Sequence, residues 1–372
     1  MIDGWEEKRL GDTINLKRGY DLPMKDRIDG EIPIFSSSGV SGLHAEAKAA
    51  GPGVITGRYG TIGSVFYSEG PFWPLNTTLY VQDFKGSHPR FIYYLLQTLN
   101  WEQFNDKSAV PGINRNDVHD ESILVPLPNE QKAIAEVLSS LDDKIDLLHR
   151  QNATLDALAE TLFRKFFVEE AQDDWEEATV SDFADHSKKG VKPQENPDIL
   201  FSHYSLPAFD SGKVPASEYG RDIRSGKYQV PDNSILISKL NPEVSRIWLI
   251  GKQESSFNIC STEFQVAKPS DPNHLPFLYC LFKSRMMRDA LTASAGGTSK
   301  SHQRVNPADI FGYAFLRPPY DLIESFAAAT TPMFEKLLAN QGQIQTLERL
   351  RDTLLPKLMS GEVRVQLGNV AA

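Results

Sequence analysis

Between positions 129 and 167, apolar residues recur in alternating steps of four and three without a break. This heptad spacing places them on one stripe of a helix, and a stripe that repeats every 3.5 residues is buried against another helix. The pattern therefore predicts a long helix that requires a helical partner. The expected seam positions are Ile134, Leu138, Leu141, Ile145, Leu148, Asn152, Leu155, Ala159, Leu162 and Phe166.

The same seam recurs 192 residues further along the chain, which indicates that the partner helix belongs to the same chain. Its seam positions include Phe326, Leu337, Asn340, Ile344, Leu347, Leu354 and Leu358. If the helices are antiparallel, Leu148 meets Ile344 and Leu155 meets Leu337. Asn152 and Asn340 then face each other, and a buried amide pair fixes helix register at some cost in stability.

The sequence that flanks the helices is also repeated. Trp5, Leu10 and Asp12 match Trp175, Val180 and Asp182 at a spacing of 170 residues, whereas Asn114 and Pro126 match Asn306 and Pro318 at a spacing of 192. The second copy therefore holds about 22 extra residues. We expect an α/β (α+β) fold with two pseudo-symmetric domains, joined by two long antiparallel coiled-coil helices.

The bulk properties are those of a globular cytoplasmic protein. The 372 residues are too many for one ordinary core, no apolar run is long enough for a bilayer, and Cys260 and Cys280 suggest neither a disulfide framework nor a metal site. The net charge of −10 argues against uniform phosphate binding. However, positions 129–174 carry 11 acidic and 5 basic residues and supply most of this excess, so localised basic patches elsewhere are compatible with DNA binding.

As a whole, this organisation resembles the specificity (S) subunit of type I restriction-modification enzymes. The segments most similar to the family are the opening at Trp5, the turn at 58–63, the sequence PLPNEQ at 126–131 and the ending at 354–365. The second half departs from the family pattern, because LNPEVS stands in place of the turn and PPYDLI in place of PLPNEQ. The resemblance implies target-recognition domain 1 (1–128), a central conserved helix (129–171), target-recognition domain 2 (172–319), a C-terminal conserved helix (320–361) and a tail (362–372). About 38 helical residues at ~1.5 Å each would span ~57 Å, which is longer than one DNA turn of ~34 Å.

The resemblance also implies a function and partners. The chain would be a non-catalytic DNA-binding subunit that recognises an asymmetric bipartite site in double-stranded DNA. It would position two methyltransferase (M) subunits and the restriction/translocase (R) subunits. S-adenosylmethionine and ATP would be bound by those partners, and this chain itself would need no cofactor.

Candidate DNA contacts follow from the same resemblance together with side-chain chemistry, because arginine, lysine and amide groups contact base edges and phosphates. Arg58 at the turn of 57–63 and its counterpart Lys239 each follow a predicted strand. The full set of candidates is Ser36, Ser37, Arg58, Tyr59, Asn114, Arg115, Lys188, Lys189, His203, Tyr204, Lys239, Lys300, His302, Gln303 and Arg304.

Two other functions compete with this interpretation. A coiled-coil scaffold with repeated protein-binding domains and no DNA specificity would show the same repeat. A self-contained adenine methyltransferase is suggested by Arg317–Tyr320, RPPY, but arginine cannot accept a hydrogen bond from the target amino group. The repeat aligns this string with VPLP, so we interpret it as the start of a helix. The sequence contains no Rossmann-type glycine pattern, Walker A sequence or metal-ligand spacing.

Overall fold

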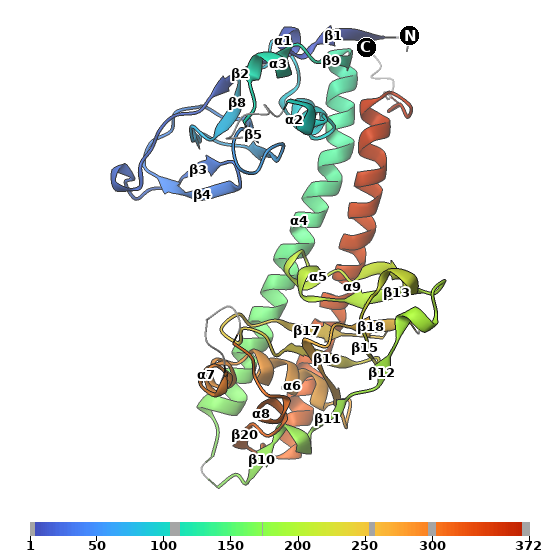
Figure 1. Ribbon diagram of the computed structural model, residues 1–372. Helices are drawn as coiled ribbons and strands as arrows, with labels where there is room; N and C mark the ends of the chain where they lie inside the picture. The colour runs from blue at the N-terminus through green and yellow to red at the C-terminus, as the bar shows by residue number, and fades with distance from the viewer. Residues whose placement is uncertain (1–3, 105–111, 173, 253–256, 297–302, 367–372) are drawn as a thin grey trace. The chain divides into compact units, whose positions relative to one another are not determined.

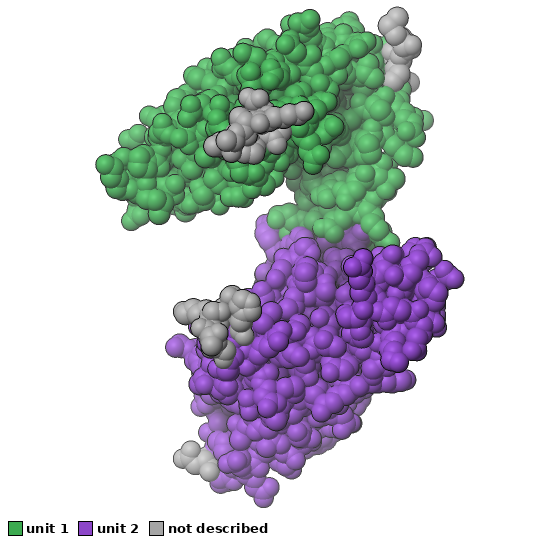
Figure 2. Space-filling model, in the orientation of Figure 1, with its two compact units in different colours: residues 1–146, 346–372 green, residues 147–345 purple. Residues whose placement is uncertain are grey.

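The computed structural model describes residues 4–104, 112–172, 174–252, 257–296 and 303–366. The chain divides into two compact units: unit 1 comprises residues 1–146 and 346–372, and unit 2 comprises residues 147–345 (Figure 2). Each unit contains one mixed helix-and-strand domain and a segment of both long helices. Among the described residues, no helix is long and apolar enough to cross a membrane.

The domain of unit 1 is built from three sheets and short helices (Figure 1). One sheet pairs β1 (Trp5–Arg9) with β9 (Ser122–Pro126). The second has the order β2 (Asn15–Arg18), β8 (Thr78–Asp83), β5 (Gly53–Gly57), β6 (Val65–Ser68). The third has the order β4 (Gly39–His44), β3 (Ile32–Ser36), β7 (Trp73–Pro74). The helices are α1 (Leu10–Thr13), α2 (Pro89–Gln97) and α3 (Arg115–His119).

The domain of unit 2 contains the same three kinds of sheet. One sheet pairs β10 (Glu177–Thr179) with β20 (Ala314–Leu316). The second has the order β11 (Ala184–Ser187), β19 (Phe264–Pro269), β16 (Ser234–Ser238), β17 (Ile247–Ile250). The third has the order β12 (Gly190–Val191), β15 (Lys227–Gln229), β18 (Asn258–Cys260), β13 (Leu200–Tyr204), β14 (Ala216–Tyr219). The helices are α5 (Leu206–Asp210), α6 (His274–Lys283), α7 (Arg285–Ser294) and α8 (Pro307–Phe311).

Several strand pairings of the two domains correspond residue by residue. Glu7 pairs with Leu124 in unit 1, and Glu177 pairs with Leu316 in unit 2, at the spacings of 170 and 192 that the sequence repeat predicts. The buried central strands agree as well: the Thr56–Leu79 pair of β5 and β8 corresponds to the Ile237–Gln265 pair of β16 and β19. The extra residues of the second copy therefore lie between these shared pairings and leave the register of those pairings unchanged.

The long helices are α4 (Pro128–Arg164), which continues into a π-helical turn (Lys165–Glu169), and α9 (Tyr320–Met359). Helix α9 begins at Tyr320, so the RPPY string is a helix start, as predicted. Within unit 2 the helices are antiparallel, because Asn152 contacts Asn340 while Phe163 contacts Phe326.

The outer positions of the α4 seam differ from the prediction. Phe163 and Phe167 are buried in the core of unit 2, whereas the predicted Leu162 and Phe166 are only partly buried beside it. A straight α-helix drifts relative to a 3.5-residue repeat, and the domain core covers the neighbouring side of the helix here. Ile134, Leu138, Ile145, Leu148, Leu337, Ile344 and Leu358 are buried.

Candidate nucleic-acid interface

In unit 1, Arg58 lies immediately after the buried strand β5 and is held by backbone hydrogen bonds on both sides. Its N–H donates to the carbonyl of Thr77 at 2.9 Å, and its carbonyl accepts from the N–H of Ile113 at 3.1 Å. Gly57 must be glycine, because a Cβ there would lie 1.9 Å from the carbonyl oxygen of Thr61. The turn therefore presents Arg58 from a rigid base.

The guanidinium of Arg58 is oriented but not neutralised. Its Nε donates to the carbonyl of Ile113 at 3.2 Å, and its Cζ lies 4.4 Å from the ring centroid of Tyr59. The Tyr59 ring in turn covers Gly112, where a Cβ would lie 2.2 Å from the ring. Within the described residues, the Arg58 side chain has no acidic partner, so both Nη groups can donate to a ligand.

The turn between β3 and β4 lies beside the Arg58 turn. A Cβ at Gly60 would be 3.4 Å from Oγ of Ser37, and Oγ of Ser36 donates to the carbonyl of Gly39 at 3.0 Å. The structure thus brings Ser36, Ser37, Arg58 and Tyr59 together, although they come from two separate segments of the sequence.

Asn114 and Arg115 follow directly after Ile113, at the start of α3. The Oδ1 atom of Asn114 accepts from the N–H of Asn116 at 3.1 Å and caps the helix. The sequence interpretation missed this local role of Asn114, which occupies its acceptor oxygen. Arg115 is exposed at the first position of the helix.

In unit 2, Lys239 is held as Arg58 is in unit 1. The N–H of Lys239 donates to the carbonyl of Glu263 at 3.0 Å, and its carbonyl accepts from the N–H of Val305 at 2.8 Å. The isolated pairing of Leu240 with Arg304 corresponds to that of Tyr59 with Gly112. The two units therefore share one backbone arrangement around a basic residue and differ in the side chains that surround it.

Two further predicted residues, Gln303 and Arg304, belong to this arrangement. The carbonyl of Gln303 accepts from the N–H of Asn241 at 2.9 Å, and Arg304 Nη2 donates to Glu263 Oε1 at 2.9 Å. Lys300 and His302 lie outside the described residues. Glu263 was not predicted, because only the strand register places it beside Lys239.

The remaining candidates lie on other parts of the domain. Lys188 and Lys189 are exposed between β11 and β12. His203 pairs through Nδ1 with Glu218, and burial lowers the pKa of its imidazole below 6.5. The expectation for Tyr204 is wrong: its side chain is 4% exposed and packs against Trp248 in the core, so it presents no surface to DNA.

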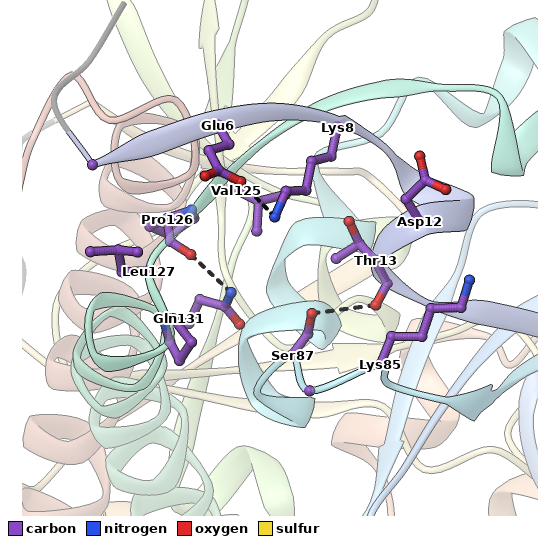
Figure 3. A pocket seen from close by; sticks show the side chains of 13 residues that line it. Glu6, Lys8, Asp12, Thr13, Lys85, Ser87, Val125, Pro126, Leu127 and Gln131 are labelled. Carbon is purple, nitrogen blue, oxygen red and sulfur yellow. Dashed lines mark hydrogen bonds and ion pairs between the residues drawn. The ribbon is translucent and has the colours of Figure 1, made fainter.

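A pocket of about 220 Å³ lies where the domain of unit 1 meets the start of α4 (Figure 3). Gln131 crosses it, donating from Nε2 to the carbonyl of Pro126 at 3.0 Å and accepting from the N–H of His88 at 2.9 Å. A pocket of about 410 Å³ occurs at the equivalent place in unit 2, lined among others by Trp175, Asp182 and Pro318. None of the described candidate DNA contacts lines either pocket. Each pocket is lined by residues of the domain and of the start of a long helix, and we call these two places the joints between domain and helix.

In the part of the chain that the structure describes, no group of three or more His, Cys, Asp or Glu side chains could hold a metal ion. Cys260 and Cys280 are both buried, and burial raises the pKa of the Cys260 thiol to about 12. A thiol in such an environment is not a nucleophile. Both units share one arrangement, in which a basic side chain directly follows a buried strand and its backbone is held by two hydrogen bonds. Such a side chain can bind an anion or a base edge.

Comparison with known proteins agrees with this chemistry. Residues 2–157 match the family described as the type I restriction modification DNA specificity domain. The chain is 26% identical over 339 residues to the type I restriction enzyme MjaIX specificity subunit of Methanocaldococcus jannaschii, covering 79% of this chain and 74% of that protein. It is 22% identical over 357 residues to the HindI specificity subunit of Haemophilus influenzae, covering 74% and 77%.

The fold also matches a solved structure. The S subunit of a type I restriction-modification system from M. genitalium aligns with 95% of this chain and 96% of its own, with a TM-score of 0.67 at 18% sequence identity. At this level of identity, the likeness concerns the fold.

Proposed function

The chain belongs to the specificity subunits of type I restriction-modification enzymes, and on that premise we propose that each unit binds one half of a bipartite, asymmetric DNA site. As a specificity subunit, the chain recognises DNA sequence and performs no catalysis itself. The chemistry of the complex belongs to its partner subunits.

One observation carries the proposal for the two half-sites. Arg58 and Lys239 are each held after a buried central strand by the same two backbone hydrogen bonds. A side chain on a rigid base can contact a base edge with little loss of entropy, and arginine and lysine donate to guanine O6 and N7. Because Arg58 is flanked by Tyr59 and Gly112 while Lys239 is flanked by Leu240 and Arg304, the two half-sites should differ in sequence.

The assignment of the other parts follows from this role. We assign positions 1–128 and 172–319 as the two recognition domains and the long helices as the spacer. The 37 residues of α4 correspond to about 56 Å at ~1.5 Å per residue, which exceeds one DNA turn of ~34 Å. Two methyltransferase subunits, which would hold S-adenosylmethionine and the target adenine, and motor-nuclease subunits that use ATP are the partners this role requires.

The decisive experiment is to express the chain with its methyltransferase subunit and to map the modified adenines in the host DNA. We expect methylation at a single bipartite sequence, and we expect the purified complex to bind that sequence with an affinity that falls steeply with salt. Replacement of Arg58 and Lys239 by alanine should reduce sequence preference in both half-sites. Replacement of two exposed arginines elsewhere, Arg9 and Arg285, serves as the matched control.

The scaffold alternative makes the opposite prediction. If the complex with its methyltransferase partner shows no sequence preference and no salt-dependent DNA binding, the chain is a protein-binding scaffold and the proposal is wrong.

A further inference from the structure

Arg304 and Glu263 form an ion pair beside Lys239 in unit 2. Arg304 Nη2 lies 2.9 Å from Glu263 Oε1, and the two side chains are 60% and 26% exposed. Both residues are fixed through their backbones: Arg304 exchanges hydrogen bonds with Gly296 at 3.1 and 2.9 Å, and the carbonyl of Glu263 accepts from Lys239. The pair therefore occupies a defined place on the candidate interface.

Among the residues of unit 1 that the structure describes, this pair has no equivalent. Val305 follows Arg304 as Ile113 follows Gly112, and both Val305 and Ile113 donate to the carbonyl of the presented basic residue. Gly112 thus stands at the position of Arg304. By the same criterion Thr77 stands at the position of Glu263, because its carbonyl accepts from the N–H of Arg58. The ion pair is a feature of one unit, whereas the backbone around it is common to both.

Stability does not explain the pair. An ion pair with an arginine exposed to this extent contributes little to folding, because solvent screens the attraction. A carboxylate on a surface that faces phosphates also weakens DNA binding by repulsion. The position of Glu263 therefore needs an explanation in terms of what it does to its neighbour.

The effect on Arg304 follows from hydrogen-bond geometry. An unrestrained guanidinium binds any nearby phosphate, which adds affinity without sequence preference. When one Nη group is held by a carboxylate, the guanidinium keeps its orientation, and its remaining N–H groups can still donate to guanine O6 and N7. The carboxylate charge disfavours a phosphate at the same place.

We propose that Glu263 is a positioning residue that makes Arg304 select a guanine in the half-site bound by unit 2. This inference rests on the proposed function and deepens it, since it assigns one specificity determinant to one half-site. It also explains why the two half-sites would differ although the backbones that present the basic residues match.

The test uses the full chain in complex with its methyltransferase subunit and DNA duplexes that carry the mapped site. Each base pair of the site is varied in turn, and affinity is compared with that for a scrambled duplex. For Glu263→Ala we expect the preference for one guanine to fall about tenfold, with no loss of affinity for scrambled DNA. Arg304→Ala should remove the preference at the same base pair. Glu263→Gln keeps an acceptor for Arg304, so it should retain part of the preference while binding scrambled DNA more tightly.

Asp198→Asn is the matched control, because it removes the acidic partner of Arg221 in an exposed ion pair of the same unit. This variant should change neither the preference for the guanine nor the affinity for scrambled DNA. Thermal unfolding of each variant establishes that the chain is folded, and Arg304 is exposed enough for its replacement to be tolerated. If Glu263→Ala leaves every base preference unchanged while wild type is sequence-specific, the role of Glu263 is refuted. If wild type itself shows no sequence preference, the proposed function fails instead.

Discussion

Asn340 donates a hydrogen bond from Nδ2 to Oδ1 of Asn152 at 2.9 Å, in a seam whose adjacent positions on both helices are apolar. The Asn340 side chain is fully buried, and Asn152 is partly exposed. A slip of either helix by one turn would place a buried amide against leucine or isoleucine and leave it without a partner. The pair therefore selects one register out of several that the apolar residues alone would permit.

Replacing Asn340 alone should destabilise the chain. In Asn340→Ala, Asn152 loses its partner beside a newly created cavity, so we expect the free energy of unfolding to fall by about 1–3 kcal/mol. The double variant with leucine at positions 152 and 340 should be neutral or more stable, because two matched apolar groups replace two desolvated amides. Urea unfolding measures both, with Gln343→Ala on the exposed side of α9 as the control. A double variant less stable than the single one would contradict this account.

Arg58→Lys tests the geometry of the presented side chain. Lysine keeps the charge but cannot reproduce the guanidinium fork, its Nε anchor on Ile113 or its stacking on Tyr59. Binding to scrambled DNA and its salt dependence should therefore persist, while preference at one base pair should fall about tenfold. Competition binding with single-base variants measures this. Arg9→Lys, at an exposed ion pair with Asp120, should leave the preference unchanged, and an equal effect of both substitutions would exclude a specific role for Arg58.

We expect the chain to lose stability in mild acid, because the imidazole of His119 must stay neutral in the folded state. Burial lowers its pKa below 6.5, and its Nε2 accepts the N–H of Leu16 at 2.9 Å, which requires the neutral ring. Below pH 6.5 the unfolded chain binds a proton that the folded chain binds only at lower pH, so the free energy of unfolding falls as the pH decreases through this window.

His119→Gln keeps an acceptor for Leu16 but cannot be protonated. The difference in unfolding free energy between about pH 7.5 and about pH 5.5 should therefore be smaller in this variant than in the wild type. It should not vanish, because burial also lowers the pKa of His88, His186 and His203. His149→Gln, on the exposed side of α4, is the control and should behave like wild type.

Lys283 anchors α6 to α4 through Asp156 and Glu160 within unit 2. Its side chain is only 17% exposed, so Lys283→Met would remove the shared cation of two carboxylates, Asp156 at 23% and Glu160 at 46% exposure. We expect a loss of about 2 kcal/mol of stability, between the values for exposed and buried pairs. Arg285→Met, which removes an 86% exposed side chain paired with Asp289, should cost less than about 1 kcal/mol. Denaturant midpoints compare the two, and equal losses would show that the Lys283 contacts are not structural anchors.

The sequence was sufficient to predict the repeat and the long helices because both are periodic signals. Trp5 and Trp175 mark equivalent openings, and the structure pairs the strands that follow them in the same register. Periodicity is a local property of the sequence, so a helix can be predicted from it without knowledge of the tertiary packing. The shift from Leu162 to Phe163 shows where it fails, since the domain rather than the partner helix decides which side is buried there.

The candidate interface was only partly predictable, because strand register is decided by residues far apart in sequence. Glu263 reaches Arg304 across 41 positions, and no local pattern marks that contact. Tyr204 has the chemistry of a DNA contact but packs against Trp248 in the core, a contact that no local sequence pattern marks. The positions of Arg58 and Lys239 directly after a strand were predictable, because an apolar run precedes each of them in the sequence.

The contacts between each domain and the long helices use different side chains in the two units. In unit 1, Tyr94 donates to Asp142 at 2.6 Å while Arg351 holds the other carboxylate oxygen at 3.0 Å. The position 192 residues beyond Asp142 is Phe334, which packs edge-on against Tyr279. A domain grafted onto the helices of the other unit would therefore meet side chains that do not match its own. Recombination that creates a new specificity should therefore exchange each domain together with its stretches of both helices. Otherwise the side chains at the new contact between domain and helix would have to be substituted as well.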